Sequence, residues 1–154
     1  RGRIGGGGAG GLWNAIAAVA GVGGSVNSDV PGTLLVDDGV SLGKSTRVQP
    51  TARHPRTAIG VTRDGGELLV VVIDGRQEGW SVGMTLPELA ELLIERGAWD
   101  AVNLDGGGST AMLLRQGDEI ESNRPSDAGG FRPVAVSLGI RVGEMVPASQ
   151  TGGE

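Results

Sequence analysis

The stretch NLDGGGSTAM, residues 103–112, places an acid, three glycines and two hydroxyls directly after a short apolar run. Successive glycines let backbone N–H groups converge on an anionic oxygen, and Ser109 and Thr110 add hydroxyl donors. Asp105 could serve there as acid, base or nucleophile, because ligand crevices open at strand ends. A glycine-rich turn capped by Asp105 explains the same residues equally well. The stretch is not a nucleotide P-loop, since the Gly-Lys-Ser/Thr ending is missing.

A second candidate is ARHPRTAIG, residues 52–60. Pro55 favours an extended His54, and Arg56 stands at the mouth of a predicted strand. The planar guanidinium suits bidentate binding of phosphate or carboxylate, although an arginine at a strand start is more often a solvated edge residue. His54, the single histidine, is either a general acid or base or an inert surface residue.

Two further polar groups stand at predicted strand boundaries. Asp74 follows the most apolar strand, in VVVIDGR, where either a turn or an active-site carboxylate fits. Arg132 begins the predicted last strand, whereas Arg124 and Asp127 fit a solvated loop. Asp74 and Asp105 could share a hard cation. We expect no metal and no cofactor, because the arginines already supply positive potential.

Composition excludes several classes of function. The chain has 154 residues, about one domain, with a net charge of −5 and no basic cluster, which disfavours nucleic acid and anionic membranes as partners. It has no cysteine, so disulfides, thiol catalysis and cysteine metal sites are excluded. No apolar run approaches the roughly 18–20 residues of a membrane span.

Turn signals and hydrophobic patterning predict the elements that position these groups. Asp-Gly turns predict hairpins at 34–42 and 58–73, with 68–73 as a central strand covered on both faces. Gly117 marks another hairpin within 111–122, and alternation predicts a last strand at 132–142.

The clearest predicted helix spans 86–96. Thr85 and Glu88 form a capping box, an inward apolar stripe follows, and Gly97 ends the helix. With strands 67–73 and 101–104 the helix makes one strand-helix-strand unit. The sequence therefore predicts an α+β fold, α/β-like in that unit, with a mixed β-sheet and a few packed helices in a single compact domain.

The glycine-rich start, residues 1–11, is typical of a flexible arm, and 147–154 of a disordered tail. The domain is predicted at 12–146. Its first stretch, 12–24, fits a short helix or a buried strand, and periodicity does not separate the two.

Five motifs together resemble the phosphodiester glycosidase family, from about Gly32 to Val142. They are LLVDDG, HPRTAIG, VVVIDGR, GMTLPELAELLIERGAWDAVNLDGGGSTAM and RPVAVSLGIRV. Each is weak alone, but five in series at family-like spacing are specific. The resemblance implies a hydrolase that cleaves a sugar from a phosphodiester at the anomeric carbon. A catalytically inactive carbohydrate- or phosphate-binding module is the alternative.

The resemblance also assigns site residues. It implies a phosphate held by arginine and the glycine loop while a carboxylate aids attack at the anomeric carbon. The expected catalytic residues are Asp105, Asp74 and Arg56, and the expected substrate- or phosphate-binding residues are Thr57, Gly106, Gly107, Gly108, Ser109, Thr110, Arg132 and His54.

Two departures from the family shape the remaining expectations. The family usually carries Asn where this chain has His54, and its domains carry an N-terminal segment with an Asn-Gly-Gly-Phe-like motif that nothing before Gly32 matches. Apolar strand edges would then be uncovered. We therefore expect a homo-oligomer, with residues 12–36 near the interface, or a second chain that supplies the missing strands. A secreted or extracytoplasmic location is also expected.

Overall fold

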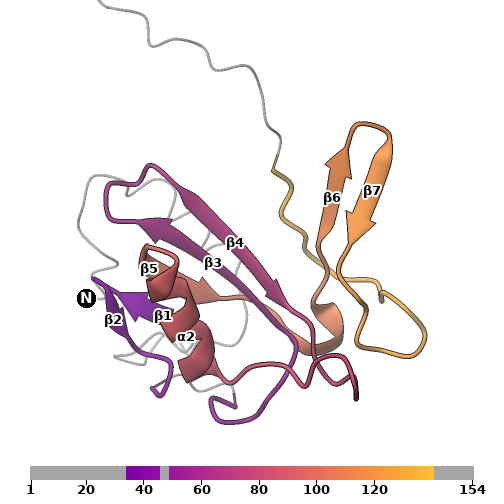
Figure 1. Cartoon of the computed structure of the whole chain (residues 1–154), viewed down its shortest axis with the longest axis horizontal. Coiled ribbons are helices and arrows are strands. Elements are labelled where there is room, and N and C mark those ends of the chain that lie inside the picture. Colours follow the sequence, from indigo (N-terminus) through magenta and orange to yellow (C-terminus); the bar gives the residue numbers. More distant parts are fainter. Residues whose placement is uncertain (1–33, 46–48, 141–154) are drawn as a thin grey trace, which may run out of the picture.

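A computed structural model describes residues 34–45 and 49–140 of the chain. The predicted arm at 1–11, the undecided stretch at 12–24 and the predicted tail at 147–154 lie outside the described residues. Figure 1 shows a sheet with one helix against it and a separate hairpin. The α+β class is confirmed.

The main sheet has five strands in the order β2-β1-β5-β3-β4. Every pairing between neighbouring strands in this sheet is antiparallel. The strands are β1 at Leu34–Asp37, β2 at Val40–Ser41, β3 at Arg56–Thr62, β4 at Leu68–Ile73 and β5 at Ala98–Asn103.

Among the described strands the expected mixed sheet and the central place of residues 68–73 are not found. Strand β3 pairs with β4 on one side and with β5 on the other. It therefore separates the two strands of the strand-helix-strand unit, which run in the same direction without pairing. Among the described strands β4 has no second neighbour, so it lies at an edge of the sheet. Apolar composition alone does not distinguish an edge strand from a central one.

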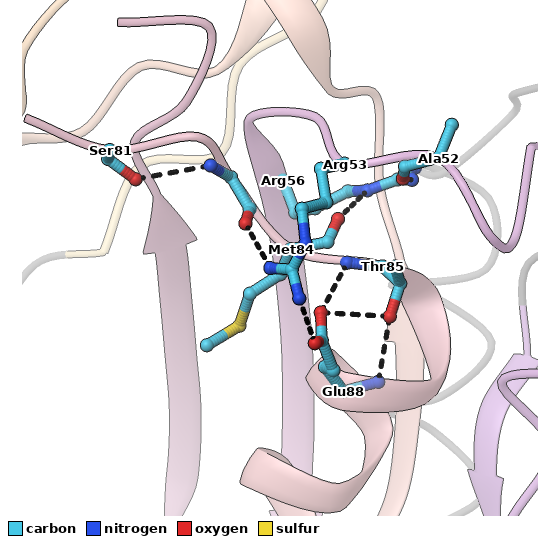
Figure 2. A network of polar contacts seen from close by, with 8 residues as sticks. Ala52, Arg53, Arg56, Ser81, Met84, Thr85 and Glu88 are labelled. Carbon is cyan, nitrogen blue, oxygen red and sulfur yellow. Dashed lines mark hydrogen bonds and ion pairs between the residues drawn. The ribbon is translucent and has the colours of Figure 1, made fainter. Parts of the chain in front are cut away.

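Helix α2, Leu86–Glu95, begins as predicted. The Thr85 hydroxyl accepts from the Glu88 backbone N–H and the Glu88 carboxylate accepts from the Thr85 N–H, which satisfies two otherwise free donors (Figure 2). Gly97, with φ +94°, follows the last turn. The apolar stripe packs against β1, β3 and β5, and its fully buried members are Leu86, Leu89, Ala90 and Leu93.

The chain after β5 is built differently. Strands β6, Leu113–Gln116, and β7, Glu119–Ser122, form the predicted hairpin as a separate, exposed two-stranded sheet. The strand predicted at 132–142 is wrong for its described part, because residues 132–140 form none. A strand forms only where a neighbouring strand accepts and donates its backbone hydrogen bonds. The alternation of apolar and polar side chains does not show whether such a neighbour is present. The alternating apolar side chains are exposed here, and Val136 keeps 61% of its surface accessible.

Candidate functional site

A cavity of about 330 Å³ lies where the segments before β3 and after β4 and β5 meet. It brings together seven of the predicted site residues and adds four residues that were not predicted. The lining residues are Gln49, His54, Arg56, Arg76, Asn103, Leu104, Asp105, Gly106, Gly107, Gly108 and Arg132.

Glycines let neighbouring backbones approach the His54–Pro55 segment closely. A Cβ on Gly83 would lie 2.4 Å from the His54 carbonyl oxygen, and one on Gly75 would lie 2.7 Å from the Pro55 nitrogen. A Cβ on Gly106 would lie 2.8 Å from the Pro55 oxygen. Two of these approaches come from the chain after β4 and one from the chain after β5. The segment between them is therefore fixed in place beside the cavity.

The glycine loop is chiefly a self-bonded turn, with a 3₁₀ turn at Gly107–Ser109. Four of the five backbone amides from 106 to 110 donate hydrogen bonds within the protein. Of these five, only the Gly108 amide has no acceptor among the described residues. An open nest of converging amides is therefore not formed, and attraction of an anion rests mainly on side chains. The acceptors are Asp105 Oδ1 for Gly106 N, Pro55 O for Gly107 N, Gly106 O for Ser109 N and Gly107 O for Thr110 N, at 3.0–3.1 Å.

Arg56 is buried and anchors the cavity wall. Its Nε donates to Met84 O at 3.0 Å, and its Nη2 donates to Ala52 O at 2.7 Å (Figure 2). Nη2 also donates to Gln49 O at 3.0 Å. Burial lowers the pKa of Arg56, and the nearby Arg76 lowers it further, yet a guanidinium stays charged at neutral pH. Arg56 therefore brings a positive charge to the cavity while most of its donors hold the backbone.

His54 lies between Gln49 and Arg76. Its Nε2 contacts Gln49 Oε1 at 2.5 Å, and its Nδ1 contacts Arg76 Nε at 3.3 Å and Nη2 at 3.2 Å. Burial lowers the pKa of His54, and the charges of Arg76 and Arg56 lower it further. The neutral ring is thus favoured.

Arg76 was not predicted as a site residue. Its backbone has φ +58°, and its Nη1 and Nη2 would both lie 3.2 Å from a Cβ on Gly107, so the guanidinium covers the glycine loop. The available signal was its position directly after Asp74-Gly75 in VVVIDGR. That motif drew attention to the carboxylate, whereas the arginine lines the cavity.

Arg132 lines the cavity as predicted, although it begins no strand. Its Nη2 donates to Ser109 Oγ at 2.5 Å, which joins the chain after the β6–β7 hairpin to the glycine loop. Thr57 and Thr110 do not line the cavity. Their hydroxyls lie 3.4 Å apart, and Thr110 is buried, so this pair supports the loop from within the protein.

The two predicted carboxylates occupy different surroundings. Asp74 does not line the cavity, and its oxygens accept from Trp80 Nε1 at 2.9 Å, Asn123 Nδ2 at 3.0 Å and Arg124 N at 3.2 Å. Asp105 is exposed and is the only carboxylate among the described residues that line the cavity.

Asn103, the last residue of β5, is a further cavity residue that was not predicted. It is 5% exposed, and its Oδ1 is buried without a hydrogen-bond partner. A buried carbonyl oxygen without a donor costs free energy, and such groups are uncommon in folded proteins. The unbonded Asn103 side-chain oxygen at the cavity wall therefore lowers the stability of the fold at the end of β5.

In the part of the chain that the structure describes, three or more histidine or acidic side chains do not gather at any point where a metal ion could be held. The same residues include no helix long and apolar enough to cross a membrane.

Comparison with known proteins gives several relatives of part of the chain. Human N-acetylglucosamine-1-phosphodiester alpha-N-acetylglucosaminidase is 44% identical over 59 residues, which cover 38% of this chain and 11% of the human protein. The SPbeta prophage-derived uncharacterized protein YomE of Bacillus subtilis is 36% identical over 93 residues, covering 59% of this chain and 14% of that protein. The chain therefore spans a small part of these relatives.

The fold is shared with a solved structure. The zebrafish N-acetylglucosamine-1-phosphodiester alpha-N-acetylglucosaminidase catalytic domain, auto-inhibited by its pro-peptide, superposes with a TM-score of 0.52 at 24% identity. The superposition covers 68% of this chain and 38% of that one.

The profile of the phosphodiester glycosidase family matches residues 16–141. The match begins at residue 16, earlier than the resemblance from about Gly32 that the motifs indicate. Because the match extends over most of the sequence, from the stretch before β1 to the end of the described residues, this chain belongs to the phosphodiester glycosidase family.

Proposed function

We propose that the protein hydrolyses the glycosidic bond between a sugar, joined through its anomeric carbon, and a phosphodiester or a related α-linked group. One observation carries the proposal. The guanidinium groups of Arg56, Arg76 and Arg132 line the same cavity as a single carboxylate, Asp105. At about 330 Å³ the cavity is within the range of small-ligand sites. The human relative's name supports an α-linked N-acetylglucosamine as the first sugar to test.

The three arginines suit the leaving group. Each guanidinium offers a planar set of donors that matches phosphate oxygens, and together they stabilise the negative charge that develops as the glycosidic bond breaks. Because Arg56 donates three hydrogen bonds to backbone carbonyls, Arg76 and Arg132 have more N–H groups available for the phosphate. The phosphate leaves as an anion and needs less protonation than an alcohol.

Asp105 suits the other half of the reaction. In the proposed step its carboxylate takes a proton from water, the water oxygen bonds to the anomeric carbon, and the bond from that carbon to the phosphate oxygen breaks. The products are the free sugar and a phosphate monoester. One carboxylate is sufficient for this step when the leaving group departs without a proton.

The test is a panel of sugar-1-phosphodiesters, with turnover and binding measured for wild type, Asp105→Asn and Arg132→Ala. Arg124→Ala is the matched control, because Arg124 is exposed, stacks on Trp80 and lies outside the cavity. We expect turnover in wild type and Arg124→Ala, turnover lowered by about 10²- to 10⁴-fold in Asp105→Asn, and weaker binding in Arg132→Ala. Binding without turnover in every variant would instead identify the inactive carbohydrate- or phosphate-binding module.

We also propose that the chain works as a homo-oligomer or with a second chain. The outer edge of β4 has no strand partner among the described residues, and the apolar side chains at 134, 136, 138 and 140 are exposed. Unpaired edges and apolar segments of this kind invite pairing between chains. Light scattering is expected to give the mass of two or more chains. A stable, active monomer that tolerates deletion of residues 1–11 would overturn this.

The secreted or extracytoplasmic location expected from the resemblance remains part of the proposal. Fractionation of the native host, with the protein followed by antibody, tests it: recovery outside the cytoplasm supports this location, and recovery with cytoplasmic markers contradicts it.

A further inference from the structure

We propose that His54 is a positioning residue that holds Arg76 over the glycine loop as a neutral hydrogen-bond acceptor, and that its protonation weakens anion binding. This inference rests on the proposed function for its ligand class, an anionic phosphate or sulfate group.

The contacts determine one tautomer of the ring. A guanidinium only donates hydrogen bonds, so His54 Nδ1 must accept from Arg76 Nε and Nη2, at 3.3 and 3.2 Å. The hydrogen of the neutral ring then lies on Nε2, which donates to Gln49 Oε1 at 2.5 Å. Gln49 and Arg76 therefore occupy both ring nitrogens in a way that only the neutral ring permits.

Within the described ranges Arg76 has no other means of fixing its guanidinium. The one ion pair there joins Arg53 and Glu88, and the hydrogen bonds of the Arg76 side chain both go to His54. An unheld arginine side chain has many rotamers, and fixing them costs conformational entropy when a ligand binds. The contact with His54 already orders the Arg76 side chain before the anion binds, and it leaves Arg76 Nη1 available to bind the anion.

Protonation of His54 reverses this contact. The charged ring donates from both nitrogens, so it no longer accepts from Arg76 and repels it. The charged groups that face the ring are Arg76 from the turn after β4 and Arg56 from the start of β3, with Arg132 and Asp105 across the cavity. The two nearer arginines and burial lower the pKa of His54, so the pairing is intact at neutral pH and is lost in acid.

The sign of the pH dependence separates this role from a plain electrostatic one. If His54 acted only through its charge, its protonation would strengthen binding of an anion. If it positions Arg76, binding weakens as the pH falls. Sulfate is the probe, because its own charge is constant over the range of about pH 5 to 8 in which histidine titrates. Sulfate binding also does not require turnover, so it remains informative if the proposed hydrolysis fails.

The experiment measures sulfate affinity by calorimetry from pH 8 to 5 for the full chain as wild type, His54→Asn, His54→Ala, Arg76→Ala and the double variant His54→Ala/Arg76→Ala. The amide oxygen of His54→Asn can accept from Arg76 without titrating. We expect His54→Ala to bind about tenfold more weakly at pH 8, His54→Asn to bind nearly as wild type, and the loss on acidification only in wild type.

The double variant completes the test. If His54 acts through Arg76, adding His54→Ala to Arg76→Ala changes sulfate affinity no further. Additive losses in the double variant, or tighter binding of wild type at pH 5 than at pH 8, would overturn the proposal. Melting curves for each variant verify folding, and the ring's partial exposure makes His54→Asn a mild change.

Discussion

Both β4 and β5 lead into an Asp-Gly pair, directly after β4 and one residue after β5, and the two carboxylates have different roles in the structure. After β4, Asp74 accepts three hydrogen bonds and ties the turn at Trp80 to the loop at Asn123 and Arg124. After β5, Asp105 lies exposed at the cavity.

The difference shows that the role of a strand-end carboxylate depends on which donors other segments bring to it. Asn123 and Arg124 are 49 and 50 residues from Asp74 in the chain, so no local motif reveals them. With Asp74 occupied in this way, the chemistry that the end of β4 contributes to the cavity is the guanidinium of Arg76 two residues later.

The two carboxylates give the largest predicted contrast. Asp105→Asn should lower kcat by about 10²- to 10⁴-fold, the usual contribution of a general base, with an unchanged melting temperature. Asp74→Asn should lower kcat by less than about tenfold yet cost about 1–3 kcal/mol of stability, because an amide N–H then faces donors that had a carboxylate. Turnover and denaturant unfolding measured on both variants check this. Equal losses of kcat at the two positions would remove the distinction between the strand ends.

The two arginines next to His54 sharpen the comparison. Arg56→Ala should destabilise the fold by about 3 kcal/mol or more, because three backbone carbonyls lose a charged donor. Arg76→Ala should leave the free energy of unfolding within about 1 kcal/mol of wild type and weaken sulfate binding instead. Urea denaturation with and without sulfate separates the two effects. A stable Arg56→Ala that loses only binding would contradict the anchoring role.

The turn after β4 offers a matched pair of glycines. Gly79 and Gly83 have φ of +74° and +91°, but a Cβ on Gly79 meets nothing within 4 Å, whereas one on Gly83 meets the His54 backbone at 2.4 Å. Gly79→Ala should cost about 1–2 kcal/mol from backbone strain alone. Gly83→Ala should cost more and should also weaken anion binding, because His54 must move. Thermal melts and sulfate titrations of both variants test this. Similar losses of stability at Gly79 and Gly83 would contradict the close contact between Gly83 and the His54 backbone.

The smallest predicted effect concerns the start of α2. Thr85→Ala removes the capping hydroxyl and should cost about 1 kcal/mol, while Thr85→Ser retains the hydroxyl and should cost less. Because Met84 O, one residue earlier, accepts from Arg56, the cap also steadies the cavity wall. Denaturant unfolding of both variants measures the effect. A loss in Thr85→Ser as large as in Thr85→Ala would assign the effect to packing.

Local signals in the sequence were sufficient for most elements of the fold. Turn dipeptides and the Thr85–Glu88 capping box predicted the hairpins and the helix, since these depend on neighbouring residues. Strand order was not predictable in this way. The position of β3 between β4 and β5 depends on tertiary packing. The alternating pattern of residues 132–140 does not show whether a partner strand is present.

Residue types and motifs predicted four of the side chains that line the cavity. Asp105, Arg56, Arg132 and His54 do line the cavity. Arg76 and Asn103 were missed because their importance comes from contacts across the fold. The amides of the glycine loop were expected to bind an anion, but four of them already have acceptors within the protein. Three acceptors are local, on Asp105, Gly106 and Gly107, and only Pro55 O comes from a segment distant in sequence.

Bond cleavage in ¹⁸O-labelled water tests the central claim most directly. The wild-type chain is incubated with an α-linked N-acetylglucosamine-1-phosphodiester, and both products are weighed by mass spectrometry, with Asp105→Asn as control. We expect water to attack the anomeric carbon, so the label appears in the released sugar and the phosphate monoester is unlabelled. Label in the phosphate, which means cleavage at phosphorus, or equal turnover by Asp105→Asn, would contradict it.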